Sequence, residues 1–173
     1  MPETQPTAPP RRGGCLRPIL IVVLLAGAAV GVWRMFVVQR FIVPASVTYM
    51  SPALKPGERA SLDRLSYHIT GPHRGDIVAV AAPGTQLGFD ILRVVAMPGE
   101  MVEVKAGVLM VDGAAVAESY ARGALAMTLE PQRVPRGRYF VLADDRAAYS
   151  ARNLRWGLVP GRDIIGRIVP AGE

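Results

Sequence analysis

The chain has 173 residues, half of them hydrophobic, one cysteine and a formal net charge of +6 at pH 7. This length allows one domain of ordinary size plus a short extra segment, and a single cysteine excludes an internal disulfide framework. Residues 1–43 hold five arginines and one glutamate. Much of the basic excess therefore flanks an apolar run, which argues against the basic, aromatic-interleaved surface of a nucleic-acid-binding protein.

The first 38 residues predict a tail and a membrane anchor. Residues 1–17 combine proline, glycine, threonine and arginine with little to bury, which is typical of a disordered tail. Residues 18–33 carry no charge, and apolar sequence resumes after Arg34. A bilayer core needs about 20 helical residues, and an arginine near one end can extend its charge to the interface. We therefore expect a transmembrane helix over residues 18–38, a cytoplasmic tail and an extracytoplasmic domain over residues 39–173.

A cleaved secretory signal is the alternative for the same segment. A basic region precedes a short apolar run that contains the small residues Ala26, Gly27 and Ala28, as at a signal-peptide cleavage site. The apolar sequence continues past these residues, which favours an anchor that stays attached.

Beyond Pro44 the pattern changes to short alternating runs broken by turn residues, as in an antiparallel β domain. A strong hairpin signal, Asp112-Gly113, separates two of these runs, and residues 97–100 form another predicted tight turn. No stretch here keeps a helical period, so the predicted fold class is mostly β behind one N-terminal transmembrane helix. The predicted strands are residues 59–65, 76–81, 89–96, 101–105, 108–111, 139–143 and 163–169.

Few residues of the types used in catalysis are available. His68 and His73 lie in a predicted loop, and neither has a metal-ligand spacing to another histidine, cysteine or carboxylate. We therefore expect no metal, no cofactor and no histidine-based triad. Lys55 and Lys105 are the two lysines of the chain, so they are the side-chain amines that could act as a general base.

Four segments, in order, resemble the conserved boxes of bacterial type I signal peptidases. They are residues 34–44; residues 50–59 with 65–67 and 74–78; residues 93–100 with 102–104 and 111–113; and residues 139–146 with 155–160 and 164–167. Together they cover nearly everything after residue 33. The resemblance implies a membrane-anchored antiparallel β domain with serine endopeptidase activity, which removes signal peptides from exported preproteins.

Both catalytic positions that the resemblance assigns are replaced in this chain. The family uses a serine nucleophile activated by a neutral, desolvated lysine. The serine precedes the Met of a Ser-Met-x-Pro motif, and here Tyr49 precedes Met50-Ser51-Pro52. The lysine precedes the arginine of the general-base box, and here Leu92 precedes Arg93. We expect Leu92 to be buried, because the pocket that keeps such a lysine neutral must be dry.

The closing box also departs from the family pattern. Asp145 stands where asparagine is usual, directly after Asp144, and the residues that brace the lysine in the family become Ser150 and Arg152 with a spacing one residue longer. Adjacent residues of an extended chain point in opposite directions. We therefore expect Asp144 and Asp145 to order a loop and not to act as an acid–base pair.

Nearby residues offer a relocated dyad as an alternative. Ser46 and Ser51 are candidate nucleophiles, although loop serines commonly serve turns. The Tyr49 phenol has an ordinary pKa of about 10 and would need its own base. If Pro98-Gly99 closes a two-residue hairpin, the register pairs Leu92 with Lys105, whose amine would then reach the vacated lysine site. The alternative for Lys105 is an exposed residue at a strand end.

Two functions stay open at this point. The chain is either a signal peptidase-like endopeptidase of the cell (inner) membrane, or a catalytically silent relative that binds preproteins or assists an active signal peptidase. The missing dyad favours the silent relative. In both cases the expected partners are signal peptides and membrane lipid, with an active signal peptidase as a further partner of the silent relative. Substrate would add an extended strand to an exposed sheet edge.

Overall fold

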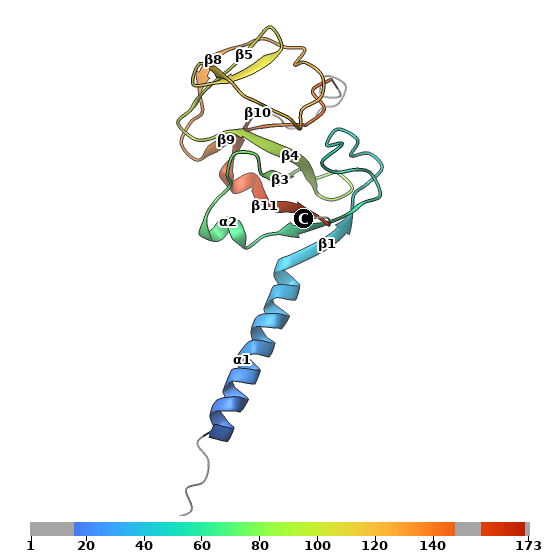
Figure 1. Ribbon diagram of the computed structural model, residues 1–173, viewed down its shortest axis with the longest axis vertical. Coiled ribbons are helices and arrows are strands. Elements are labelled where there is room, and N and C mark those ends of the chain that lie inside the picture. The colour runs from blue at the N-terminus through green and yellow to red at the C-terminus, as the bar shows by residue number, and fades with distance from the viewer. Residues whose placement is uncertain (1–15, 148–156, 172–173) are drawn as a thin grey trace, which may run out of the picture. The chain divides into compact units, whose positions relative to one another are not determined.

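The computed structural model describes residues 16–147 and 157–171. The chain divides after Phe36 into two units, an N-terminal helix and a domain that begins at Val37. Figure 1 shows the helix and the two sheets of the domain.

Helix α1 spans Leu16–Val37. Its proline, Pro18, lies in the first turn, where a missing backbone N–H breaks no helical hydrogen bond. The large apolar side chains between Ile19 and Val30 are 55–65% exposed. Within residues 16–147 and 157–171, no helix has both the length and the apolar character needed to cross a membrane, so the predicted span is not confirmed. Its predicted last residue, Val38, belongs to a strand of the domain.

The larger sheet has seven antiparallel strands in the order β1-β2-β11-β3-β4-β9-β10. Its members are β1 Val38–Ile42, β2 Arg59–Asp63, β3 Ile77–Ala81, β4 Phe89–Ala96, β9 Arg138–Leu142, β10 Gly157–Pro160 and β11 Ile164–Pro170. All eight residues of β4 are buried. This strand therefore lies at the centre of the core, as its almost continuous apolar sequence predicts.

The smaller sheet has four strands in the order β7-β6-β5-β8. Its members are β5 Met101–Lys105, β6 Val108–Val111, β7 Ala114–Ala115 and β8 Leu129–Arg133. Val111 pairs with Ala114, so Asp112-Gly113 forms the predicted two-residue hairpin, with both residues at positive φ. Among the described residues of the domain there are also two short helices, α2 over Ser66–Ile69 and the 3-10 helix η2 over Gly161–Asp163.

The mostly antiparallel β architecture is confirmed, and each predicted strand has a counterpart within one or two residues at its ends. Four observed strands were not predicted: β1, β7, β8 and β10. β1 follows α1 without a turn residue, β7 has two residues, and β8 contains Pro131, which normally counts against a strand. β1, β7, β8 and β10 are the four edge strands, where the alternating apolar signal is weakest.

The register expected around Pro98-Gly99 is wrong. β4 and β5 lie in different sheets, so Leu92 pairs with Val78 and Lys105 pairs with Val108. At the turn between the two sheets, Gly99 N donates to the carbonyl of Val134 at 2.8 Å. The geometric basis for Lys105 as a base at the Leu92 position is therefore removed, and Lys105 is exposed.

Candidate functional site

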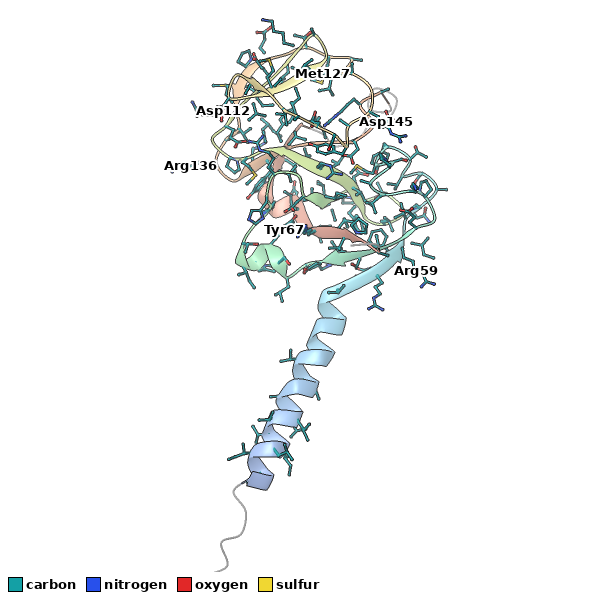
Figure 2. The ribbon with its side chains drawn as sticks, viewed as in Figure 1. Arg59, Tyr67, Asp112, Met127, Arg136 and Asp145 are labelled. Atoms are coloured by element: carbon teal, nitrogen blue, oxygen red, sulfur yellow. The ribbon has the colours of Figure 1, made fainter. Side chains whose placement is uncertain are left out.

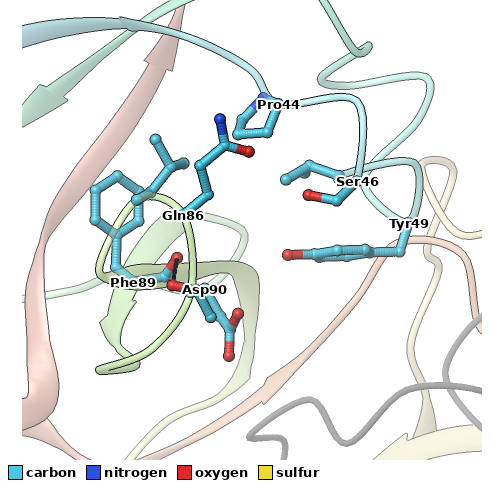
Figure 3. Close-up of a pocket in the computed structure, with 9 residues that line it drawn as sticks. Pro44, Ser46, Tyr49, Gln86, Phe89 and Asp90 are labelled. Atoms are coloured by element: carbon cyan, nitrogen blue, oxygen red, sulfur yellow. Dashed lines mark hydrogen bonds between the residues drawn. The ribbon is translucent and has the colours of Figure 1, made fainter.

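A cavity of about 240 Å³ lies between the loop after β1 and the beginning of β4. The loop contributes Pro44, Ser46, Val47 and Tyr49, and the facing wall contains Thr85, Gln86, Leu87, Phe89 and Asp90. Figure 3 shows these two walls facing each other, with the Tyr49 ring extending from the loop toward the β4 side. Most of the lining is apolar, with hydroxyl, amide and carboxylate groups at a few points, which is the composition expected of a ligand site.

Backbone hydrogen bonds fix the loop that carries Tyr49. Val43 N donates to the carbonyl of Glu58 and Gly57 N donates to the carbonyl of Val43, both at 2.8 Å, which closes the base of the loop. Farther along, Asp145 N donates to the carbonyl of Tyr49, also at 2.8 Å. The phenol therefore projects from a tethered backbone, and Tyr49 is 4% exposed.

Leu92 is fully buried, which confirms the prediction made for this position. It does not line the cavity, but Asp90 does. Asp90 and Leu92 are two residues apart on β4 and thus project from the same face of the strand. An apolar side chain with no ionisable group stands where the family resemblance assigns the base.

The two candidate serines are separated by the structure. Ser46 lines the same cavity as Tyr49. Ser51 is not among the lining residues, and its backbone N–H closes a turn onto the carbonyl of Thr48 at 3.2 Å. Only Ser46 is therefore placed to meet a ligand in this cavity.

The first half of β4 has a strand partner on one side only among the described residues. β3 pairs with the whole of residues 89–93, whereas β9 pairs with Arg93, Val94 and Ala96. Among the described residues, residues 89–92 therefore have β3 as their one neighbouring strand, and Phe89 and Asp90 of this stretch line the cavity. A stretch of strand with a strand neighbour on one side and a cavity beside it is the geometry that accepts an added strand.

Next to Leu92, Arg93 forms a buried ion pair with Asp144. Its Nε and one terminal nitrogen donate to the two carboxylate oxygens at 2.7 and 2.6 Å, and its other terminal nitrogen donates to the carbonyl of Gly75 at 2.7 Å. The Tyr120 ring lies 4.1 Å from the guanidinium carbon. Burial alone would lower the pKa of Arg93, but the hydrogen bonds and negative charge of Asp144 outweigh it and raise that pKa. The ion pair therefore joins β4 to the segment after β9, and the hydrogen bond to Gly75 joins β4 to the segment before β3.

Asp144 and Asp145 both make contacts within the closing box. Asp144 is fully buried in its ion pair, while the Asp145 carboxylate accepts a hydrogen bond from Ala147 N at 3.0 Å. Arg146 is 2% exposed and is paired with Glu118. Ser150 and Arg152 lie outside the described residues.

The histidines have no catalytic arrangement in the described part of the chain. His73 is 65% exposed at its side chain and approaches Asp76 at 3.7 Å, whereas His68 is exposed on α2. Residues 16–147 and 157–171 contain no group of three or more histidine, cysteine or acidic side chains that could hold a metal ion.

Asp90 is the site residue that sequence reasoning missed. It is 7% exposed in a strand that is otherwise apolar apart from Arg93. A charged residue within an apolar strand is itself a signal, because a buried carboxylate is costly unless it is paired or hydrogen-bonded.

Comparison with known proteins agrees with this arrangement of boxes. A profile of the family described as "Signal peptidase, peptidase S26" matches residues 16–171. The chain is 33% identical over 167 residues to probable signal peptidase I-1 of Synechocystis sp., covering 90% of this chain and 82% of that protein. It is 31% identical over 179 residues to signal peptidase I of Leptolyngbya laminosa, covering 97% and 85%. The crystal structure of a signal peptidase I from Enterococcus faecalis aligns at 25% identity and a TM-score of 0.44, covering 56% of this chain and 95% of that one.

Proposed function

Because the chain belongs to the signal peptidase family, peptidase S26, we propose that it binds signal peptides of exported preproteins without cleaving them. The family's activity is the cleavage of signal peptides, so these peptides are the ligand class that its members recognise. Under this proposal the chain recognises signal peptides but does not hydrolyse them.

The observation that supports peptide binding is that residues 89–92 of β4, beside the cavity, are paired with β3 and not with β9. An extended peptide that pairs with residues 89–92 would continue the larger sheet, which has β3 on the other side of the same strand. Alternate side chains of that peptide would point toward the cavity. With a volume of about 240 Å³, the cavity has room for side chains of the bound peptide.

The lack of cleavage is proposed from the two replaced positions. Serine hydrolysis in this family needs a hydroxyl and a neutral amine within hydrogen-bond reach of each other. Tyr49 offers a phenol, and Leu92 offers no proton acceptor at all. Removing a nucleophile or its base in a serine hydrolase costs on the order of 10⁴- to 10⁶-fold in rate, and removing both costs little more.

The test compares binding and cleavage of one labelled signal peptide by the full chain in neutral detergent. We expect saturable binding with no product for the unmodified protein. Tyr49→Ser alone and Leu92→Lys alone should stay inactive, because a serine without a base and a lysine without a nucleophile are both idle. The double variant should regain slight cleavage. Robust cleavage by the unmodified protein would overturn the proposal.

The second candidate is an endopeptidase with a relocated nucleophile, and it is favoured by the position of Ser46 in the same cavity as Tyr49. The carboxylate that lines this cavity is Asp90, which makes it the group to test as the base. Under this alternative, Ser46→Ala and Asp90→Asn would each abolish a cleavage seen in the unmodified protein. Ser51→Ala and Lys105→Ala are matched controls outside the cavity and would leave it unchanged.

We also propose that α1 holds the domain at a membrane and stays attached in the mature protein. The support is its apolar surface, because large side chains such as Leu24 and Leu25 are 64% and 65% exposed and exposed apolar patches of this kind mark interaction surfaces. The proposed orientation is a cytoplasmic tail and an extracytoplasmic domain. Alkaline extraction and protease protection test it. Release at alkaline pH, or a mature N-terminus after residue 28, would contradict it.

A silent relative also needs an active signal peptidase in the same cell, and this enzyme is the proposed protein partner. Co-purification of the full chain with that enzyme from detergent-solubilised membranes is the test. Cells that contain no other signal peptidase would exclude the silent role.

A further inference from the structure

A second cavity, of about 430 Å³, opens beside α2 and shares no residue with the cavity at Tyr49. We name it the α2 pocket. It is built from α2 and the turn that follows it, the start of β9, and the junction of η2 with β11. Its lining residues are Arg64, Tyr67, His68, Gly71, Pro72, Gly137, Tyr139, Gly161, Arg162, Ile164 and Ile165.

The ionisable groups that could carry charge at neutral pH in the α2 pocket are basic. Arg64 and Arg162 line it together with His68, and none of its lining residues is acidic. Arg64 donates to the neutral amide oxygen of Gln39 at 3.2 Å. Arg162 is 86% exposed at its side chain and approaches Asp163 only at 3.8 Å. Both guanidinium groups therefore keep donors for an incoming anion.

The nearby carboxylates are engaged elsewhere. Asp63 accepts hydrogen bonds from Leu65 N at 2.9 Å and Ser66 N at 3.2 Å, which caps the turn into α2. Asp76 accepts from the Tyr67 hydroxyl at 2.9 Å and pairs with Arg167 at 3.4 Å. Through these contacts the two acids stabilise the wall of the pocket.

Glycines keep the space around Tyr139 open. A Cβ atom at Gly161 would lie 3.1 Å from the Tyr139 ring and 3.3 Å from the carbonyl of Gly137. A Cβ atom at Gly71 would lie 3.7 Å from the Tyr139 hydroxyl. The pocket thus combines room, two guanidinium groups and a phenol, which are the donors that phosphate oxygens bind in proteins.

We propose that the α2 pocket binds a phosphate group, carried either by an anionic lipid headgroup or by a small soluble ligand. The lipid source has specific support, because Ile69 at the end of α2 is 78% exposed beside His68 and can enter an apolar layer while the arginines meet the headgroups. Arg64 also contacts Gln39, two residues after the last residue of α1. This proposal is independent of signal-peptide binding at the β4 edge.

The test uses the full chain in neutral detergent. Titration calorimetry measures binding of inorganic phosphate and of glycerol 3-phosphate, and native mass spectrometry measures retention of phosphatidylglycerol against phosphatidylcholine from doped micelles. The variant Arg64→Ala/Arg162→Ala should weaken binding at least about tenfold, because it removes both charged donors. Arg59→Ala is the matched control, since Arg59 is exposed at the opposite end of β2 from Arg64. Figure 2 shows Arg59 and Tyr67 on opposite sides of the domain.

Gly161→Ala supplies a variant with unchanged charge. Its methyl group would crowd Tyr139 and narrow the pocket, so it should also weaken phosphate binding. Binding of both soluble phosphates supports the shared chemistry, and retention of phosphatidylglycerol alone supports the lipid source. The proposal is overturned if the unmodified protein shows no saturable binding of inorganic phosphate or glycerol 3-phosphate and does not retain phosphatidylglycerol. It is also overturned if Arg59→Ala weakens binding as much as the pocket variants do, because the attraction would then be a general effect of surface charge.

Discussion

Arg93 and Asp144, 51 residues apart in sequence, are joined by two hydrogen bonds within the core. This contact ties β4, which carries Leu92, to the segment after β9 whose Asp145 backbone holds Tyr49. The two positions that the resemblance assigns to catalysis are thus braced by one ion pair.

Removing one member of this pair should strongly destabilise the folded domain. Asp144→Ala would leave the Arg93 guanidinium buried and unpaired, at a cost of about 3–5 kcal/mol in the free energy of unfolding. Chemical denaturation followed by circular dichroism measures this change. Lys55→Ala is the control: it breaks a pair whose lysine side chain is 60% exposed, so it should change stability by less than about 1 kcal/mol. Equal effects of the two variants would contradict the structural role of the pair.

Leu92→Lys should make stability depend on pH in a defined direction. Burial favours the neutral amine and therefore lowers the pKa of the new lysine in the folded state below its unfolded value of about 10.4. Between the folded and the unfolded pKa of this lysine, the unfolded chain binds more protons than the folded chain. The free energy of unfolding should therefore rise as pH increases toward about 10. Denaturation at several pH values measures the slope, and Leu92→Met is the apolar control. A slope no steeper than that of Leu92→Met would mean that position 92 is open to water.

Two of the five tyrosines should titrate late. Burial, followed by the charge and hydrogen bond of Asp76, raises the pKa of Tyr67. Burial, followed by Glu118, raises the pKa of Tyr120. Because both groups ionise more easily when the chain is unfolded, their contribution to stability is complete below pH about 10 and is lost above it. Tyrosinate absorbance measures the titration, and Tyr67→Phe should remove one late-titrating group. A single tyrosine transition near pH 10 would contradict the prediction.

Strand addition at β4 predicts a distinct response to changes in the peptide backbone. N-methylation of a peptide amide that faces residues 89–92 removes a donor and should weaken binding by about tenfold. N-methylation of the next residue, whose amide points away, should have little effect. Fluorescence anisotropy of a labelled signal peptide measures both. Equal effects at successive positions would indicate that the peptide does not bind as a strand.

The sequence predicts the inner strands of the domain better than its edges. β4, β5 and β6 match their predicted bounds because buried or alternating apolar residues mark both ends. β10 and β8 escape prediction because their pairing depends on distant partners: Val159 pairs with Tyr139, and Met101 pairs with Arg133. Local preference carries little information about such contacts.

In the candidate site, too, some features follow from local sequence and others depend on distant parts of the chain. Burial of Leu92 follows from the chemistry that the family requires at that position, and the structure confirms it. The cavity residue Asp90 and the separation of Leu92 from Lys105 depend on which sheet each strand joins, and a turn such as Pro98-Gly99 is compatible with either outcome. Tertiary placement, not turn chemistry, decides the register here.

The hydrogen bond between Asp145 N and the Tyr49 carbonyl has a mechanical consequence. A displacement of the segment after β9 would be transmitted through it to the backbone of the Tyr49 loop. Because Asp144 in that segment is also held by Arg93 of β4, the loop and the strand that line the cavity are linked through one short stretch of chain. A change in that stretch would therefore alter the width of the cavity without touching any residue that lines it.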